Sequence, residues 1–153
     1  MALVMEKSIP YHFGVPEKMM IVTEVTVVNP ITGKRKPYRA VWDTGATGSL
    51  ITKKVATDLE LQRVSDGTAN GMTGKRDAIP IYLAHFVIEN IDVKLSLPFE
   101  MDAYNDGIDV AIGMDIIGNG DFSLTRQADG SIRMRFQSPP ACFSDLPNTK
   151  LPK

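Results

Sequence analysis

The chain has 153 residues, with 17 basic and 18 acidic side chains and a formal net charge of −1. A chain of this length suggests one domain that is large enough to bury a sizeable core. The nearly balanced charge provides no field that would attract nucleic acid or an anionic membrane surface. Because Cys142 is the single cysteine, no disulfide can form within the chain. We therefore expect neither a nucleic-acid partner nor a disulfide-stabilised fold.

Residues 1–7 lack the positively charged start and the long apolar stretch of a signal peptide. Elsewhere, no apolar run approaches the roughly 20 residues that a helix needs to span a bilayer. We therefore expect a cytoplasmic protein that has no membrane partner.

The first part of the chain predicts an irregular arm followed by a β-hairpin. Residues 1–18 contain two prolines and a glycine, and we expect an N-terminal arm there. Residues 19–28 alternate between apolar and polar side chains, as a half-buried strand does. A turn cluster follows at 29–33, and residues 38–42 form the return strand that leads into Asp43.

The middle of the chain predicts a short helix and a second hairpin. Thr52 can cap a helix that runs to about Leu61. Residues 66–75 are rich in glycine and polar side chains, and strand-like sequence lies beyond them. This pattern indicates a flexible hairpin loop whose tip lies near 71–74.

The second half continues mainly as strands. We expect strands at 79–88, 91–97 and 108–112, an acidic loop at 100–107, and a helical turn at 114–117. The 91–97 segment has the clearest alternation. Most elements are thus strands, and the predicted class is all-β with one or two short helices.

The C-terminal part predicts a final hairpin and a tail. Its strands begin at Phe122 and return over 132–136, with the turn at Asp129-Gly130. Residues 139–153 contain repeated prolines and indicate a loose tail. We therefore divide the chain into an arm (1–18), a domain (19–138) and a tail (139–153).

The most informative stretch is residues 40–51, Ala-Val-Trp-Asp-Thr-Gly-Ala-Thr-Gly-Ser-Leu-Ile. An apolar run that reads as a buried strand ends abruptly at Asp43, and Gly45 allows a tight turn there. A carboxylate that a strand holds at a fixed depth among apolar residues is a candidate for chemistry.

This stretch resembles the active-site motif of the retropepsin-like aspartic peptidases. The motif occurs once in the chain, whereas two-lobed pepsin-like enzymes carry it twice, and in the retropepsin-like group two identical chains each provide one aspartate. The segment 111–115, Ala-Ile-Gly-Met-Asp, is similar to the apolar-apolar-glycine segment that packs under the active-site loop in this family. The resemblance covers about residues 21–136.

The resemblance implies the retropepsin-like acid protease fold, a closed six-stranded-type barrel, and a two-fold homodimer. The implied activity is an aspartic endopeptidase that hydrolyses peptide bonds in a peptide or protein substrate. Water would be activated by general acid–base catalysis between Asp43 of two subunits. Thr44 would hydrogen-bond across the dimer, and Gly45 would offer its backbone to substrate. No cofactor and no metal are expected.

The resemblance also assigns residues that contact substrate. These are Ala46 and Thr47 beside the catalytic motif, and the flap at Gly71, Met72, Thr73 and Gly74. Retroviral members often have an acid at the position of Thr47 and an arginine at that of Met114. Neither charge is present here, and their absence favours the non-viral branch of the family.

Two other interpretations of the function stay open at this point. A protease-like fold can persist as a non-catalytic dimeric module that binds extended peptides. An aspartate turn after a strand also occurs in phosphate-handling enzymes, but Gly45 stands where a second acid would be needed and no GK[ST] loop is present. The acids Asp102, Asp106 and Asp109 indicate a solvated loop rather than a calcium site. Trp42 is interpreted as core packing.

Overall fold

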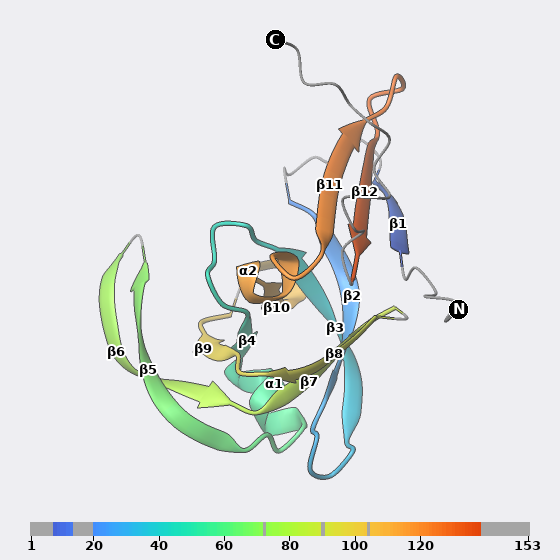
Figure 1. The fold of residues 1–153 in the computed structure, drawn as a ribbon. Coiled ribbons are helices and arrows are strands. Elements are labelled where there is room, and N and C mark those ends of the chain that lie inside the picture. The colour runs from blue at the N-terminus through green and yellow to red at the C-terminus, as the bar shows by residue number, and fades with distance from the viewer. Residues whose placement is uncertain (1–7, 14–19, 72, 90, 104, 139–153) are drawn as a thin grey trace. The chain divides into compact units, whose positions relative to one another are not determined.

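The computed structural model describes residues 8–13, 20–71, 73–89, 91–103 and 105–138. The chain divides into two units, within each of which the residues contact one another closely. One is Lys18–Ile116, and the other combines Met1–Glu17 with Ile117–Lys153. Both units are built from strands, and the helices are short (Figure 1). This confirms the all-β class that the sequence predicts.

The larger unit contains a nine-stranded sheet, counted over the described residues, with the order β5-β6-β9-β4-β10-β3-β2-β7-β8. Two short helical segments, α1 (Lys53–Asp58) and the 3-10 turn η1 (Asn105–Gly107), connect its strands, and α2 (Met114–Ile117) follows the last of them. The strands are β2 (Val22–Val28), β3 (Arg35–Trp42), β4 (Leu50–Thr52), β5 (Arg63–Gly71), β6 (Gly74–Tyr82), β7 (Ala84–Ile88), β8 (Ile91–Ser96), β9 (Phe99–Met101) and β10 (Ile108–Ile112).

The core of this unit lies on alternate residues of the central strands and on the inner side of α1. Apolar side chains gather there because their removal from water stabilises the folded state. The most deeply buried large side chains of this unit are Val25, Val27, Ile51, Val55, Leu59, Phe86, Ile88, Ile108, Val110 and Ile112.

The predicted first hairpin is confirmed. Strands β2 and β3 pair antiparallel from Val22↔Val41 to Val28↔Arg35. Their turn is organised by the buried side chain of Asn29, whose Oδ1 accepts hydrogen bonds from the backbone N–H groups of Ile31 and Thr32. Because Asx side chains stabilise tight turns in this way, the local sequence was sufficient to predict this element.

Strand β10 is inserted between β3 and β4. It runs parallel to β3, with Ile112 opposite Trp42, and antiparallel to β4, with Val110 opposite Ile51. The chain therefore leaves the sheet at the end of β3, crosses the end of β10, and re-enters the sheet at β4. This arrangement places residues 43–49 in a loop at one edge of the buried strands.

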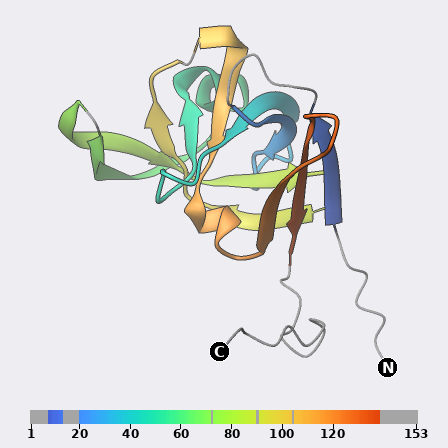
Figure 2. The same cartoon turned by 90° about the horizontal axis from the view of Figure 1, so that it is seen from above.

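The predicted closed barrel is wrong. Among the described residues, the strand order starts at β5 and ends at β8, and no pairing joins these two strands. One reason is that the β5–β6 hairpin reaches out from the rest of its unit (Figures 1 and 2), with most β5 side chains exposed. A hairpin that buries little of itself gains little from closing against another strand.

Two further local predictions need correction. The predicted strand at 79–88 is interrupted between Tyr82 and Ala84, where the Leu83 N–H donates a hydrogen bond to the Gln62 carbonyl. The predicted acidic loop at 100–107 begins inside β9, which includes residues 100 and 101 and pairs parallel with β4. Both differences depend on partners that are distant in sequence, so alternation within the segments could not reveal them.

The smaller unit is a three-stranded antiparallel sheet with the order β1-β12-β11. Strands β11 (Asp121–Arg126) and β12 (Ile132–Gln137) form the predicted final hairpin. Strand β1 (Ser8–Phe13) pairs with β12 in the stretch where an irregular arm was expected, which is a correction. Pro10 is compatible with β1 because an edge strand tolerates a residue that has no N–H. The boundaries at 18 and 138 stay predictions.

The predicted helix after the candidate loop exists, but Thr52 does not cap it with its side chain. Helix α1 ends at Asp58, and Thr52 occupies the N-cap position without a side-chain bond to the helix. Its Oγ1 instead donates a hydrogen bond to Asp109 Oδ1 at 2.9 Å, because β10 brings this carboxylate alongside β4.

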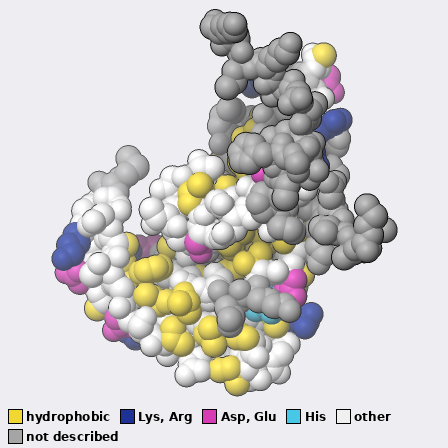
Figure 3. Space-filling model, in the orientation of Figure 1, with side chains coloured by type: hydrophobic (Ala, Val, Ile, Leu, Met, Phe, Trp, Pro, Cys, Tyr) yellow, Lys and Arg dark blue, Asp and Glu magenta, His cyan; other side chains and the backbone are white. Residues whose placement is uncertain are grey.

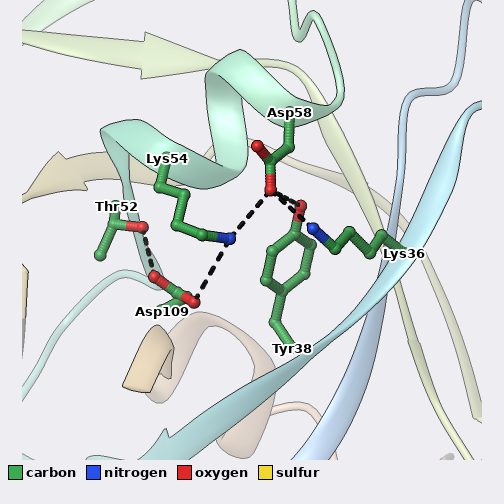
Figure 4. A network of polar contacts seen from close by, with 6 residues as sticks. All are labelled: Lys36, Tyr38, Thr52, Lys54, Asp58 and Asp109. Atoms are coloured by element: carbon green, nitrogen blue, oxygen red, sulfur yellow. Dashed lines mark hydrogen bonds and ion pairs between the residues drawn. The ribbon is translucent and has the colours of Figure 1, made fainter. Parts of the chain in front are cut away.

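A polar network fastens α1 to β3 and surrounds a buried tyrosine (Figure 4). Asp58 Oδ2 lies 2.9 Å from both Lys36 Nζ and Lys54 Nζ. The Tyr38 hydroxyl donates to the same oxygen at 3.2 Å, and the two ammonium groups lie 5.6 and 5.1 Å from the centre of its ring. One carboxylate thus serves two cations and one hydroxyl.

The network shifts the titration of its members. Hydrogen bonds from Lys54 and Lys36 lower the pKa of Asp58 to about 2. Burial and the neighbouring Asp58 carboxylate raise the pKa of Tyr38 well above its usual range. Since the carboxylate form of Asp58 is favoured in the folded chain, it contributes stability above the ordinary pKa of a carboxyl group, and this contribution disappears as the pH falls towards 2.

We predict that Asp58→Asn lowers the free energy of unfolding at pH 7. The difference from wild type should shrink as the pH is lowered from about 4 to about 2, because the wild-type carboxylate then takes up a proton. Denaturant unfolding over this pH range measures the effect. Asp77→Asn, which removes an exposed acid of β6, serves as control. A loss that is equal at pH 7 and pH 2 would contradict the prediction.

Candidate active site

Asp43 follows β3 directly and is held by backbone groups on both sides. Its N–H donates a hydrogen bond to the Ile112 carbonyl of β10 at 2.9 Å. Its side-chain Oδ1 accepts a hydrogen bond from the Gly45 N–H, also at 2.9 Å. The side chain is half-buried, whereas Thr44 and Gly45 are exposed. The carboxylate is therefore fixed in position while the turn beside it remains accessible.

Gly45 leaves room for this carboxylate. A Cβ atom at position 45 would lie 3.2 Å from Asp43 Oδ1, which is closer than ordinary van der Waals contact. Any side chain here would push the carboxylate or the turn aside. Glycine at position 45 therefore allows both the hydrogen bond to Asp43 and the observed orientation of the Asp43 carboxylate.

Trp42, the residue before Asp43, anchors the turn in the core. Its side chain is buried, and its indole Nε1–H donates to the hydroxyl of Thr23 on β2 at 3.0 Å. The polar tip of this large residue is therefore satisfied inside the core. The prediction that Trp42 packs in the core is confirmed.

The loop after Asp43 is tied to the start of α2 by two backbone bonds. The N–H of Met114 donates to the Ala46 carbonyl at 2.8 Å, and the N–H of Asp115 donates to the Thr47 carbonyl at 3.2 Å. Thr47 and Met114, the positions where retroviral members often carry a charge pair, each take part in one of these two backbone bonds.

The buried side chain of Ser49 also links the loop after Asp43 to the segment around Gly113. This side chain is 0% exposed. Its hydroxyl donates to Asp115 Oδ1 at 2.7 Å and accepts from the Gly113 N–H at 3.0 Å. Because a buried donor without a partner is costly, both bonds stabilise this arrangement.

Gly113 allows the two segments to approach closely. A Cβ atom at this position would lie 2.5 Å from the Gly48 carbonyl oxygen and 3.0 Å from that of Ala46. These atoms belong to the main chain and cannot rotate away, so a side chain would displace the loop. The segment that the sequence singles out around Gly113 thus packs against the loop that carries Asp43.

The predicted hairpin with its tip at 71–74 is confirmed in shape. Gly71 pairs with Gly74, and the φ angle of Gly74 is +110°, a conformation that glycine adopts readily. Gly71, Thr73 and Gly74 are exposed, and Met72 lies outside the described residues. Their contact with substrate stays a prediction.

Sequence reasoning missed Phe99. This half-buried residue lies on β9, and its N–H donates to the Ser49 carbonyl at 3.1 Å. Its ring lies beside both Gly48 and Gly67 of the hairpin. Phe99 belongs to no motif. The one signal in the sequence is Gly67 inside a strand, because a glycine there often marks the close approach of a bulky neighbour.

In the described part of the chain, no group of three or more His, Cys, Asp or Glu side chains is placed to hold a metal ion. Of the acids considered for calcium, Asp102 pairs with Arg76 at 3.0 Å and Asp109 accepts from Thr52. No helix among the described residues is long and apolar enough to cross a bilayer.

We predict that Ser49→Ala lowers the free energy of unfolding by about 1–3 kcal/mol, because the buried Gly113 N–H loses its acceptor. The matched control is Ser96→Ala. Ser96 is buried on β8, and its hydroxyl has no hydrogen-bond partner among the described residues. Its removal should leave stability unchanged or slightly higher. Urea unfolding at one protein concentration measures both variants, and equal losses would contradict this assignment of Ser49.

Comparisons with known proteins agree with this geometry. The family model of the gag-polyprotein putative aspartyl protease matches residues 30–119, which include the Asp43 loop, the hairpin and Gly113. Among curated proteins, none matches the chain significantly.

Solved structures share the fold at low sequence identity. A retropepsin-like aspartic protease from Rickettsia conorii is 16% identical with a TM-score of 0.55, over 86% of this chain and 94% of that protein. The EIAV protease, solved with the inhibitor HBY-793, is 18% identical with a TM-score of 0.50, over 67% of this chain and 88% of the viral one. The family match covers more than half of the chain, and the protein therefore belongs to the gag-polyprotein putative aspartyl proteases, a retropepsin-like family.

Proposed function

We propose that this protein is an aspartic endopeptidase that acts as a homodimer, with Asp43 of each subunit in one shared active site. The observation that carries the proposal is the Asp43 turn. There, a half-buried carboxylate accepts the Gly45 N–H at 2.9 Å at the end of a buried strand, in a chain of a protease family. A protease function follows from the family, and the roles of the individual residues are our proposal.

Peptide hydrolysis by this route needs a base that activates water and an acid that protonates the substrate. Two carboxylates about 3 Å apart can perform both roles, since they cannot both ionise at that distance, as is known for aspartic proteases as a class. The shared proton belongs to the pair, so the two groups titrate together. Asp43 and its copy would form this pair.

A second copy is the simplest source of the second carboxylate. The motif occurs once in the chain, and a residue near a two-fold axis meets its own copy. Thr44 and Gly45 are exposed next to Asp43, which leaves this face accessible to another subunit. We assign to Thr44 a hydrogen bond across the dimer and to Gly45 a backbone contact with substrate.

The substrate would be an extended peptide that lies between the Asp43 loop and the β5–β6 hairpin. Ala46 and Thr47 would line one side, and the tip at Gly71, Met72, Thr73 and Gly74 would close over the other. Glycines and exposed side chains at a hairpin tip suit a segment that must open and close. Exclusion of water by such closure strengthens the electrostatic interactions at the reacting carbonyl.

We predict that Asp43→Asn abolishes cleavage of a peptide library. The loss should be about 10²–10⁴-fold or more, because Asn can neither accept nor donate the transferred proton. The variant should retain the fold, since Asn Oδ1 can still accept the Gly45 N–H. Mass spectrometry of the library after incubation measures cleavage, and circular dichroism checks the fold.

The control for this experiment is Asp92→Asn, which removes one carboxylate of β8 outside the loop. It should cleave as wild type does. Undiminished cleavage by Asp43→Asn would exclude the mechanism. Binding of the library peptides without cleavage by wild type would instead identify a peptide-binding module with a protease-like fold.

A further inference from the structure

Phe99 occupies a position between the candidate loop and the hairpin. Strand β9 pairs parallel with β4, which places Phe99 opposite Leu50, and its N–H bonds to the carbonyl of Ser49 in the loop. On the other side, Phe99 pairs with Ile81 of β6. The main chain of this residue is therefore held by both walls of the proposed substrate site.

The ring of Phe99 fills space that two glycines leave empty. A Cβ atom on Gly67 would lie 2.4 Å from Phe99 Cε1 and 2.9 Å from Ile81 Cδ1. A Cβ atom on Gly48 would lie 3.8 Å from two atoms of the same ring. Glycine inside a strand weakens it, so its presence in β5 is explained by the close approach of this ring.

Phe99 is only half-buried, so part of it can contact a ligand. Figure 3 shows the surface hollowed beside the hairpin, with apolar side chains gathered over the region where β9 lies. Recognition sites for peptide side chains are typically apolar and concave. The exposed part of Phe99 in such a hollow is available to a ligand.

We propose that Phe99 determines substrate specificity. Its ring forms the floor of a subsite under the β5–β6 hairpin and restricts that subsite to small or medium-sized apolar side chains. The inference rests on the proposed function, because it assigns a specificity-determining residue to the same substrate site. Gly48 and Gly67 act as positioning residues, since they set how far the ring can extend between the loop and the hairpin.

Shortening Phe99 tests the proposal. Phe99→Ala should enlarge the subsite. Phe99→Leu, which keeps an apolar branched side chain, should enlarge it less, and it replaces the alanine variant in the test if alanine impairs folding. The measurement is the cleavage profile of a peptide library in which one position near the scissile bond varies from Ala to Trp. We expect the ratio of kcat/KM for aromatic over small side chains to rise about tenfold or more at one position.

The glycine contact gives an independent test. Gly67→Ala should reduce kcat/KM about tenfold in the wild-type background, because the new methyl group displaces the ring, and much less in the Phe99→Ala background. Ser65→Thr, which adds a methyl group to an exposed side chain of the same strand, is the matched control for adding a methyl group to the hairpin. Equal effects of Gly67→Ala in both backgrounds, or an unchanged profile in both Phe99 variants, would overturn the proposal.

Failure of the proposed function gives a different result. If wild type cleaves none of the peptides, the same library is equilibrated with wild type and with the folded Phe99 variant, and bound peptides are quantified. A bound set that widens towards aromatic side chains supports the subsite although catalysis is absent. An identical bound set, or no binding by either protein, overturns it.

Discussion

The insertion of β10 between β3 and β4 is the constraint on which the candidate site depends. It forces the chain between Asp43 and Ser49 to pass over the end of a buried strand, where the Ile112 carbonyl accepts the Asp43 N–H. The passage is so close that position 113 has no space for a side chain. A reactive carboxylate needs such a support, because small displacements of catalytic groups greatly reduce rates.

The elements that could be predicted from sequence were those with local signals. Local geometry is fixed by residue preferences in the turn around Asn29, in the strand that leads to Asp43 and at the hairpin tip at Gly74. The motif at 43–51 and the glycine at 113 were also recognisable because the close contact between them leaves little choice of residue.

The features that could not be predicted depend on partners distant in sequence. Strand β1 forms because β12 is available, and the hydroxyl of Thr52 turns from its helix to Asp109 because β10 lies alongside. Phe99 carries no motif, and only the three-dimensional structure brings its ring between Gly48 and Gly67. The proposed specificity therefore depends on the contact of the Phe99 ring with Gly48 and Gly67, which sequence patterns do not predict.

The central claim is that one active site requires Asp43 from two copies of the chain. Mixing wild type with Asp43→Asn protein, at constant total concentration and after subunit exchange, tests this claim most directly. If a site needs both carboxylates, mixed dimers are inactive and cleavage falls with the square of the wild-type fraction. Cleavage that falls in simple proportion to the wild-type fraction would show that each chain acts alone, and would contradict the account.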